Sequence, residues 1–281
     1  SSFGNVKRLG IYDEVLLDSM QLTDFRSVLQ IIKQHRPDEI YNLAGQSSVG
    51  LSFQQPVETL ESISTGVLNL LEGVRFSELP IRLYNAGSSE CFGDTGSEAA
   101  DENFPFRPRS PYAAAKAAAH WIVANYREAY SIHACSGILY NHESPLRPVR
   151  FVTRKITSTA VRIANGEDTR LKLGNIDICR DWGYAPEYVE AMWLMLQQES
   201  AEDYVVASGK SHSLREFVAG VFARLNLDWE QHVDLEPALL RPTDLMHSCG
   251  NPQKAQKGLG WSAGTGFEQL LDKLVEGESL A

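Results

Sequence analysis

The sequence predicts an α/β fold built on a doubly wound, mostly parallel sheet, with a smaller mixed domain beside it. Short apolar runs of strand length, at 39–43, 81–86 and 132–140, alternate with amphipathic stretches of helical period. This arrangement is typical of parallel sheets covered by helices. Small polar residues follow directly after the first two runs. Ligands of open α/β sheets bind at the carboxyl ends of the strands, so we expect the functional site there.

Length and composition narrow the class of protein. With 281 residues, 43% of them apolar, the chain can bury a sizeable core in one large or two smaller domains. The net charge of −10 argues against a general nucleic-acid or anionic-membrane binder. No apolar run approaches the roughly 20 residues that a membrane span needs, and we expect no signal peptide. The four cysteines lack metal-ligand spacing, which predicts reduced thiols, no zinc site and a cytoplasmic location.

The first part of the chain predicts two strands and two helices. A strand is expected at 11–18, and the stretch 23–35 predicts an amphipathic helix capped by Thr23 or Asp24. The buried strand 39–43 follows. Pro56 then opens a long helix to about residue 76, whose apolar residues cover more than one face.

The stretch after that helix carries the candidate chemistry. The strand 81–86 is followed by a loop, and Ser110-Pro111 begins a helix with serine as N-cap and proline at the first helical position. Tyr112 and Lys116 stand four residues apart, so their side chains share a face of this helix. A nearby ammonium favours a phenolate and lowers its pKa from about 10, which would let Tyr112 exchange a proton at neutral pH.

Two residues at the end of the strand complete this arrangement. Ser88 would hydrogen-bond the same substrate oxygen as Tyr112, and Glu90 adds a carboxylate two residues further on. A Tyr-x-x-x-Lys pair by itself is more often a surface pair on a helix. The Ser-Ser-Glu sequence at a strand end favours the catalytic interpretation over that one.

The second half of the chain predicts the remaining elements. Strands are expected at 132–140, 170–173 and 204–207, and helices at 151–165, 186–197, 213–225, 251–260 and 267–275. Gly166 ends the first of these helices, and Ser213 with Glu216 forms a capping box at the third. The strand at 204–207 should return to the main sheet.

The spacing Ser88…Tyr112-x-x-x-Lys116 on a strand–loop–helix frame resembles the extended short-chain dehydrogenases/reductases. Longer stretches resemble the GDP-mannose 4,6-dehydratase family, most closely its bacterial members, and the likeness runs from the first residues nearly to the last. These stretches are NAGSSECFG (85–93), FRPRSPYAAAKAAAHWIVANYREAY (106–130), GILYNHESPLR (137–147), FVTRKI (151–156), RDWGYAPEYVEAMWLMLQ (180–197) and RPTD (241–244).

The resemblance implies a Rossmann-like fold and dehydration of GDP-mannose to GDP-4-keto-6-deoxymannose by internal hydride transfer through NADP. By this likeness Tyr112 removes the O4 proton as hydride leaves C4, with Ser88 and Lys116 in support. Glu90 then removes the C5 proton and protonates the departing C6 hydroxyl, and the hydride returns to C6. A related nucleotide-sugar reductase or epimerase would share the first three residues without needing Glu90. A non-catalytic relic without a phosphate-binding loop is the other alternative.

Binding roles also come from the resemblance. Cofactor contacts are implied for Leu43, Ala44, Gln46, Tyr112, Lys116, Leu139 and His142. Substrate contacts are implied for Ser47, Ser89, Asn141, Lys155, Arg180, Arg241 and Asp244. Guanidinium and ammonium groups suit a diphosphate, whereas Arg147 and Arg150 are equally well explained as solvated surface. His142 and Glu143 are neighbours that point apart, so we expect no metal site.

The resemblance also divides the chain. A cofactor-binding domain is expected at 1–142 and 177–208, and a nucleotide-sugar domain at 143–176 and 209–281. Family members pair the helices matching 56–76 and 111–128 across a dimer as a four-helix bundle. The likeness therefore implies a homodimer or homotetramer, the alternative being that both helices only cover the sheet.

Three features depart from the family pattern. The sequence contains no glycine-rich turn for a cofactor pyrophosphate, and the family places one βαβ unit before the position of Ser1, so we expect such a unit upstream. Gln21 stands where the family has an aspartate near the adenine. Asp244 stands where the family has glutamate, which shortens by one methylene the side chain expected to reach a ribose.

Overall fold

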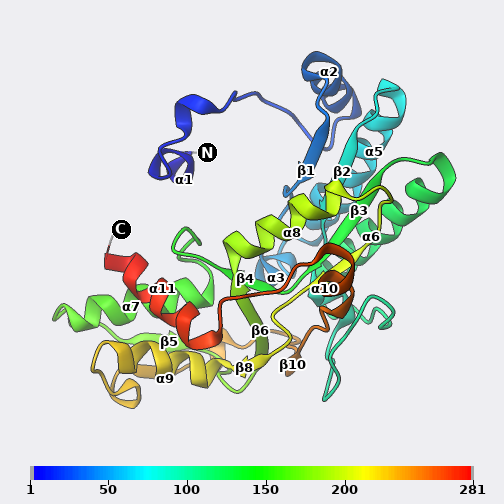
Figure 1. The fold of residues 1–281 in the computed structure, drawn as a ribbon. Helices are drawn as coiled ribbons and strands as arrows, with labels where there is room; N and C mark the ends of the chain where they lie inside the picture. The colour runs from blue at the N-terminus through cyan, green and yellow to red at the C-terminus, as the bar shows by residue number, and fades with distance from the viewer. Residues whose placement is uncertain (1–2, 280–281) are drawn as a thin grey trace.

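The computed structural model describes residues 3–279, and its centre is a four-stranded sheet (Figure 1). Its strands are β1 (Glu39–Asn42), β2 (Arg82–Ala86), β3 (Ala134–Leu139) and β7 (Tyr204–Val206). They lie in the order β1-β2-β3-β7, and all neighbours are parallel. This confirms the doubly wound, mostly parallel α/β fold and the return of β7 to the main sheet.

Helices connect and cover the strands. They are α1 (Gly4–Arg8), α2 (Phe25–His35), α3 (Val49–Ser52), α4 (Pro56–Leu60), α5 (Gly66–Ser77), α6 (Pro111–Tyr130), α7 (Val152–Ala164), α8 (Ala185–Gln197), α9 (Leu214–Arg224), α10 (Gln253–Leu259) and α11 (Phe267–Ser279). Short 3-10 helices are η1 (Tyr12–Glu14), η3 (Ser89–Phe92), η4 (Trp229–Gln231) and η5 (Pro237–Leu239), and η2 (Glu61–Thr65) is a π-helix. Within residues 3–279, no helix has the length and apolar content to cross a membrane.

The side chains of β2 show why the sheet has two helical layers. Leu83 is buried among residues of α2, α5 and α6, whereas Tyr84 is buried on the opposite face with residues of α8 and α10. Successive side chains of a strand point to opposite faces, so this central strand contributes to both cores through Leu83 and Tyr84.

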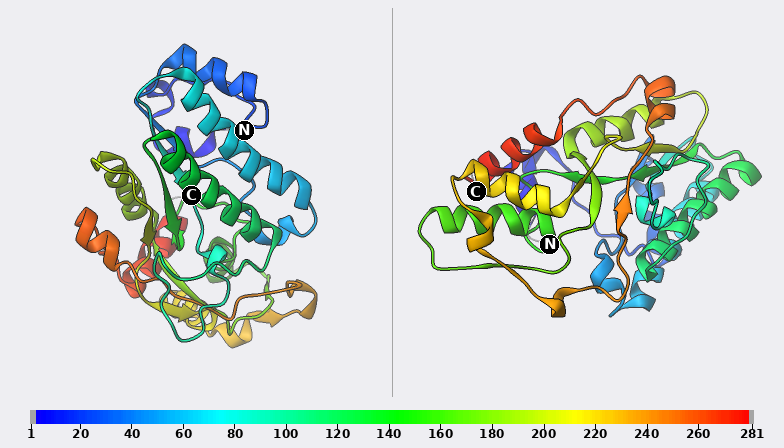
Figure 2. Two further views of the ribbon diagram at one scale, coloured as in Figure 1. Left: turned by 90° about the vertical axis from the view of Figure 1, so that its right-hand side faces the viewer. Right: turned by 90° about the horizontal axis from the view of Figure 1, so that it is seen from below.

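Beyond β3 the chain builds a second group of strands. β4 (Asn141–Glu143), β6 (Cys179–Tyr184) and β10 (His247–Ser248) are parallel, β8 (Ser211–Ser213) is antiparallel to β6, and β5 (Leu171–Leu173) pairs with β9 (Val233–Leu235). A second core joins α7, α9 and α11 through Ile156, Phe217 and Leu270. Figure 2 shows these helices grouped at one end of the molecule, away from α5 and α6. The domain boundaries stay a prediction, and α10 packs against α8 and β7 of the first group.

The helix starts follow local capping chemistry. The Asp24 carboxylate accepts a hydrogen bond from the amide of Arg26, and Ser110 accepts one from Ala113. Ser213 forms the expected capping box at α9. Each cap satisfies backbone donors that have no partner within the helix, so these predicted helix starts are confirmed.

The strand predicted at 11–18 is wrong. The chain there forms only the turn η1 and then runs without regular structure. Its apolar side chains, which suggested a strand, stay in solvent, with Leu16 81% exposed. An isolated apolar run gains a strand only when a neighbouring strand supplies hydrogen bonds, and no strand among residues 3–279 pairs with this segment.

The long helix predicted from Pro56 is present but changes its winding. α4, η2 and α5 follow one another without interruption, with a π-helical stretch in the middle. At this stretch the Ser64 hydroxyl donates to the carbonyl of Ala115 in α6 (3.0 Å), and the Ser62 hydroxyl accepts from the amide of Gln46 (3.3 Å). The π-helix therefore joins α6 to the loop after β1.

Candidate active site

The catalytic candidates meet at the carboxyl end of β2. Ser88 follows this strand and caps η3, its hydroxyl accepting a hydrogen bond from the amide of Glu90 (3.3 Å). Ser88 and Ser89 are buried, while Glu90 is partly exposed. The strand end and the short helix together hold a hydroxyl and a carboxylate at the edge where ligands of parallel sheets bind.

Helix α6 brings its own two candidates to the same place. Ser110 and Pro111 begin the helix, and alanines on its inner face let it pack closely on the sheet. Lys116 is only 8% exposed, and its ammonium donates a 2.7 Å hydrogen bond to the carbonyl of Ala86, the last residue of β2. Tyr112, one turn earlier, hydrogen-bonds the Ser88 hydroxyl. The structure thus brings Ser88, Tyr112 and Lys116 together.

The expected effect of Lys116 on Tyr112 is not present in this structure. Burial raises the pKa of Tyr112, and the hydrogen bond from Ser88 and the charge of Arg147 only partly oppose this rise. The ammonium of Lys116 lies 5.9 Å from the centre of the Tyr112 ring, because it is bonded to Ala86. Desolvation of the phenolate therefore outweighs the neighbouring cations.

Glu90 is surrounded by charged residues from the second half of the chain. Burial raises the pKa of Glu90, Arg180 and Arg241 counteract the rise, and Asp244 adds to it. A carboxyl whose pKa is shifted upward is suited to both accept and donate a proton near neutral pH. The structure places this carboxyl beside two of the predicted diphosphate ligands.

Arg180, Arg241 and Asp244 form one charged group. The Arg180 guanidinium is buried and donates to the carbonyls of Leu245 (2.7 Å) and Cys179 (2.9 Å) and to the Asp244 carboxylate (3.0 Å). Arg241 is more exposed and lies 3.7 Å from the same carboxylate. Arg180 therefore joins β6 to residues 244–245 by hydrogen bonds as well as carrying charge, whereas Arg241 is accessible to a ligand.

The other predicted substrate contacts lie on several elements. Asn141 is partly exposed on β4, and Lys155 on α7 donates to the carbonyl of Lys172 (2.6 Å). The Ser47 hydroxyl accepts a 3.4 Å hydrogen bond from Arg150. Arg150, for which the sequence left a solvated surface position as an equal alternative, therefore contacts one of the predicted substrate-binding residues.

The predicted cofactor contacts lie at the ends of β1 and β3. In the loop after β1, the amide of Ala44 donates to Asn42 (3.3 Å) and Gln46 donates to Thr59 (3.2 Å), while Leu43 is exposed. Leu139 is buried at the end of β3. His142 contacts the carbonyl of Tyr140 through Nδ1 (2.9 Å) and stacks on Tyr188, and burial lowers the pKa of His142 to about 4.

These residues fit one half of a nicotinamide dinucleotide. The Tyr112 hydroxyl and the Lys116 ammonium are donors of the kind that ribose hydroxyls accept, and neutral His142 completes a polar rim at the strand ends. Among residues 3–279, no glycine-rich turn of the kind that binds a pyrophosphate joins a strand to a helix. The fit is therefore to the nicotinamide end of the cofactor.

Comparison with known proteins decides the family. The family model described as GDP-mannose 4,6 dehydratase matches residues 2–274. GDP-mannose 4,6 dehydratase 1 of Arabidopsis thaliana is 49% identical over 259 residues, which cover 91% of this chain and 72% of that protein. GDP-mannose 4,6-dehydratase of Sinorhizobium fredii is 42% identical and covers 98% of this chain and 86% of that protein. The chain belongs to the GDP-mannose 4,6-dehydratase family.

A solved structure agrees with this placement at the level of the fold. The Thermus thermophilus UDP-glucose 4-epimerase complex with NAD has a TM-score of 0.86 to this chain and is 28% identical to it. The match covers 98% of this chain and 88% of the epimerase. The sheet and the helices that position the catalytic candidates are thus shared with another nucleotide-sugar enzyme.

In this member of the GDP-mannose 4,6-dehydratase family, two residues near the site had no role assigned from the sequence. Arg147 donates to the carbonyl of His142 (2.9 Å), lies 3.0 Å from the buried Glu143 carboxylate, and directs its charge at Tyr112. The Cys91 thiol donates to the carbonyl of Ala113 (3.7 Å). The local sequence does not distinguish Arg147 from Arg150, because the turn after β4 decides which of the two side chains points inward.

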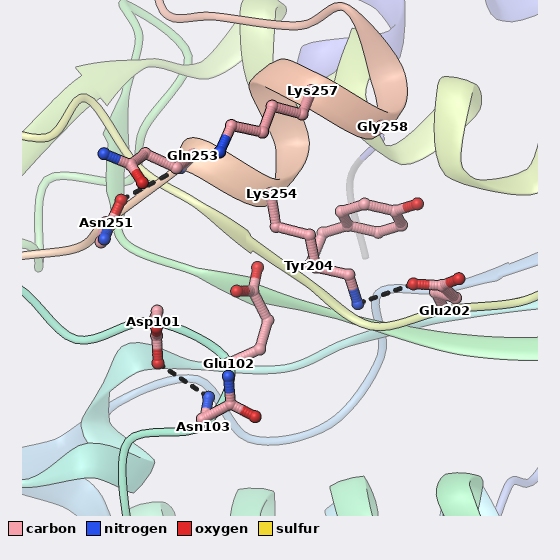
Figure 3. Close-up of a pocket in the computed structure, with 10 residues that line it drawn as sticks. All are labelled: Asp101, Glu102, Asn103, Glu202, Tyr204, Asn251, Gln253, Lys254, Lys257 and Gly258. Atoms are coloured by element: carbon pink, nitrogen blue, oxygen red, sulfur yellow. Dashed lines mark hydrogen bonds and ion pairs between the residues drawn. The ribbon is translucent and has the colours of Figure 1, made fainter.

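A separate hollow lies away from these residues of the dehydratase. It has a volume of about 570 Å³ and lies between β7, α10 and the loop around Glu102 (Figure 3). Lys254 in its wall pairs with Glu202 (2.9 Å) and donates to the carbonyl of Asp203 (2.8 Å). None of the predicted site residues lines this hollow.

Within residues 3–279, no group of three His, Cys, Asp or Glu side chains could hold a metal ion.

Proposed function

We propose that the residues described above carry out the family reaction, the dehydration of GDP-mannose to GDP-4-keto-6-deoxymannose. The cofactor is NADP, which would, when bound, accept the hydride from C4 and later supply it to C6, with Tyr112 and Lys116 at its nicotinamide end. The observation that supports these residue roles is the position of Glu90, a carboxyl of raised pKa next to Ser88 and Tyr112. A reductase or an epimerase needs no second base there, whereas elimination of water does.

Tyr112 and Ser88 serve the first step. Ser88 donates a hydrogen bond to O4 of the mannose, and Tyr112 takes the O4 proton as the C4 hydrogen leaves. Burial disfavours the phenolate of Tyr112, and the Ser88 hydrogen bond and the Arg147 charge favour it. Lys116 is anchored to the carbonyl of Ala86, which fixes this turn of α6 against the end of β2.

Glu90 serves the second step. The 4-ketone acidifies the C5 hydrogen, Glu90 accepts this proton, and it gives a proton to the C6 hydroxyl, which leaves as water. The proton taken from C5 leaves with the water. Tyr112 then gives the proton that it took from O4 to C5, as the hydride is added at C6. Burial raises the pKa of Glu90, and the charges of Arg180 and Arg241 partly oppose this rise.

The diphosphate of the substrate needs positive charge in a chain whose net charge is −10. Arg241, Lys155 and Arg180 supply it, with Asn141 and Ser47 toward the sugar. Arg241 is the most direct diphosphate ligand of the three, because Lys155 and Arg180 donate to backbone carbonyls, whereas Arg241 donates to none within residues 3–279. Asp244 lies next to it and is placed to accept a hydrogen bond from the ribose.

The variant Glu90→Gln in the NADP-loaded holoenzyme tests these roles. Glutamine keeps the size and hydrogen bonding of the side chain but accepts no proton from C5, and loss of a general base typically removes ~10²–10⁴ in rate. Bound NADPH should still form from GDP-mannose, seen by its near-ultraviolet absorbance. The 4-keto-6-deoxy product and the exchange of C5 hydrogen with deuterated water should nearly disappear. Normal turnover by Glu90→Gln would refute the role of Glu90.

We further propose that two copies associate through α4, α5 and α6. Val57, Leu60, Phe76 and Trp121 on these helices are exposed, and Trp121 is 63% exposed. Exposed apolar residues on neighbouring helices are typical of protein interfaces. Trp121→Glu should lower the mass measured by sedimentation to that of a monomer, and an unchanged mass would place the interface elsewhere.

A cytoplasmic location is also proposed, because the four cysteines are free.

A further inference from the structure

The loop that carries Glu90 toward α6 is tied to one segment from the last sixth of the chain. Residues 93–109 form this loop, and residues 243–251 run beside it. The backbone hydrogen bonds between them are Thr95 N to His247 O (3.0 Å), Ala100 N to Cys249 O (2.9 Å) and Asn251 N to Ala100 O (2.9 Å). We call these contacts, with the side-chain bonds described next, the loop junction.

Side chains complete the loop junction. The Asp94 carboxylate accepts from the amide of Met246 (2.7 Å). The Thr95 hydroxyl is buried, lies 3.3 Å from Nδ1 of His247 and accepts from the amide of Cys249 (3.3 Å). Nε2 of His247 lies 2.8 Å from the Ser211 hydroxyl on β8. Thr95 is thus the point where the loop meets β10 and, through His247, β8.

The same segment contacts the charges that act on Glu90, because Asp244 belongs to it and Arg180 is bonded to it. Asp244 and the carbonyl of Leu245, both bonded to Arg180, immediately precede the residues that contact Asp94 and Thr95. On the other side, Glu90 is only a few residues from Asp94. Between them Gly93 has φ +74°, and a Cβ there would lie 2.3 Å from the carbonyl oxygen of Arg107. Because this turn is tightly packed, a displacement of the Thr95 backbone would also displace Glu90.

The groups for the first chemical step are held mainly by bonds outside the loop junction. Ser88 is fixed by β2 and by its bond to the amide of Glu90, Lys116 by the carbonyl of Ala86, and the start of α6 by the Ser110 cap. The bonds of Lys116 and Ser110 involve no residue of 94–100 or 243–251, and the contact of the segment with the start of α6 is the Thr243 hydroxyl, which donates to the carbonyl of Arg109 (2.6 Å). Glu90 is therefore tied to the loop junction more directly than Tyr112 and Lys116 are.

We propose that Thr95 is a positioning residue for the elimination step. Through the loop junction it holds the Glu90 carboxylate in register with Arg180 and Arg241, without touching the substrate. The inference rests on the proposed role of Glu90 as the base at C5. A base that is displaced by about 1 Å loses on the order of 10²-fold in rate, whereas a group that is correctly held loses nothing.

Thr95→Val in the NADP-loaded holoenzyme tests the proposal, since valine keeps the shape and loses the hydroxyl. We expect the rate of C5 exchange with deuterated water and the rate of product formation to fall by roughly 10-fold or more, with bound NADPH forming at near the wild-type rate. Thr95→Ser, which restores the hydroxyl, should recover most of the exchange. In the unloaded protein, amide hydrogen exchange of residues 90–98 should be faster in Thr95→Val.

Thr265→Val is the matched control. The Thr265 hydroxyl also donates to a side chain, the Glu187 carboxylate (2.6 Å), but it has no bond to the loop junction. It should leave both rates and the exchange of residues 90–98 unchanged. If Thr95→Val is insoluble, Asp94→Ala replaces it, because it removes the acceptor of the Met246 amide.

The outcomes separate the inference from the function on which it rests. An equal fall of NADPH formation and C5 exchange in the Thr95 or Asp94 variant, or no fall in either, would overturn the positioning role. If the unmodified holoenzyme forms neither NADPH nor a 4-keto product from GDP-mannose, the proposed function itself fails. A selective loss of exchange that Thr95→Ser restores would establish the positioning role.

Discussion

Lys116 offers a test of the site that needs neither substrate nor cofactor. Its ammonium is buried at the end of β2, and burial lowers the pKa of Lys116 to about 8. The ordinary pKa of a lysine is about 10.4. The perturbation is Lys116→Met, which replaces the ammonium by an uncharged side chain of similar length and leaves other titrating groups in place.

The sign follows from proton binding in the two states. Below pH 8 both the folded and the unfolded chain carry the charge, and the folded state bears the cost of its burial. Between pH 8 and about 10.4 the unfolded chain binds the proton and the folded chain does not, so the stability of the wild type rises with pH. One pKa unit is worth about 1.4 kcal/mol. The wild type should therefore gain roughly 2–3 kcal/mol relative to Lys116→Met between pH 7 and pH 10.

Urea unfolding of both proteins at pH 7, 8, 9 and 10 measures this difference. Groups other than Lys116 titrate in both proteins, so their contributions cancel when the free energies of unfolding are subtracted. The free energy of unfolding of Lys116→Met minus that of the wild type should therefore be larger at pH 7 than at pH 10. A difference that stays constant within about 0.5 kcal/mol across this range would show that Lys116 is not desolvated, and the arrangement of β2 and α6 would have to be redrawn.

The remaining predictions concern charge and reactivity. Arg241→Ala should raise KM for GDP-mannose with little change in Tm, because among residues 3–279 its guanidinium pairs only with the Asp244 carboxylate, at 3.7 Å. Arg180→Ala should raise KM and also lower Tm, since the carbonyl of Leu245 loses a buried donor. A fall in Tm with unchanged KM would make Arg180 purely structural. Burial raises the pKa of Cys91 to about 12, so iodoacetamide at pH 8 should leave Cys91 unmodified in the native protein and alkylate it after unfolding; labelling of the native protein at the unfolded rate would contradict its burial.

Local chemistry explains which predictions from the sequence were correct. Capping by Asp24, Ser110 and Ser213 depends on residues within one turn of helix, so the start of each helix is readable from the sequence alone. The spacing of Tyr112 and Lys116 fixes a shared helix face in the same way. The ordered motifs then identified the family, which the comparisons confirm.

Long-range packing decided the rest. The apolar run 11–18 lacks a pairing strand among residues 3–279, and periodicity alone does not supply one. The pKa of Tyr112 rises because burial outweighs its cations, and burial is a property of the whole fold. The loop junction joins Thr95 to His247 across about half of the chain. Hydrogen bonds between residues so far apart leave no local pattern, so only the tertiary structure shows that Thr95 and His247 are in contact.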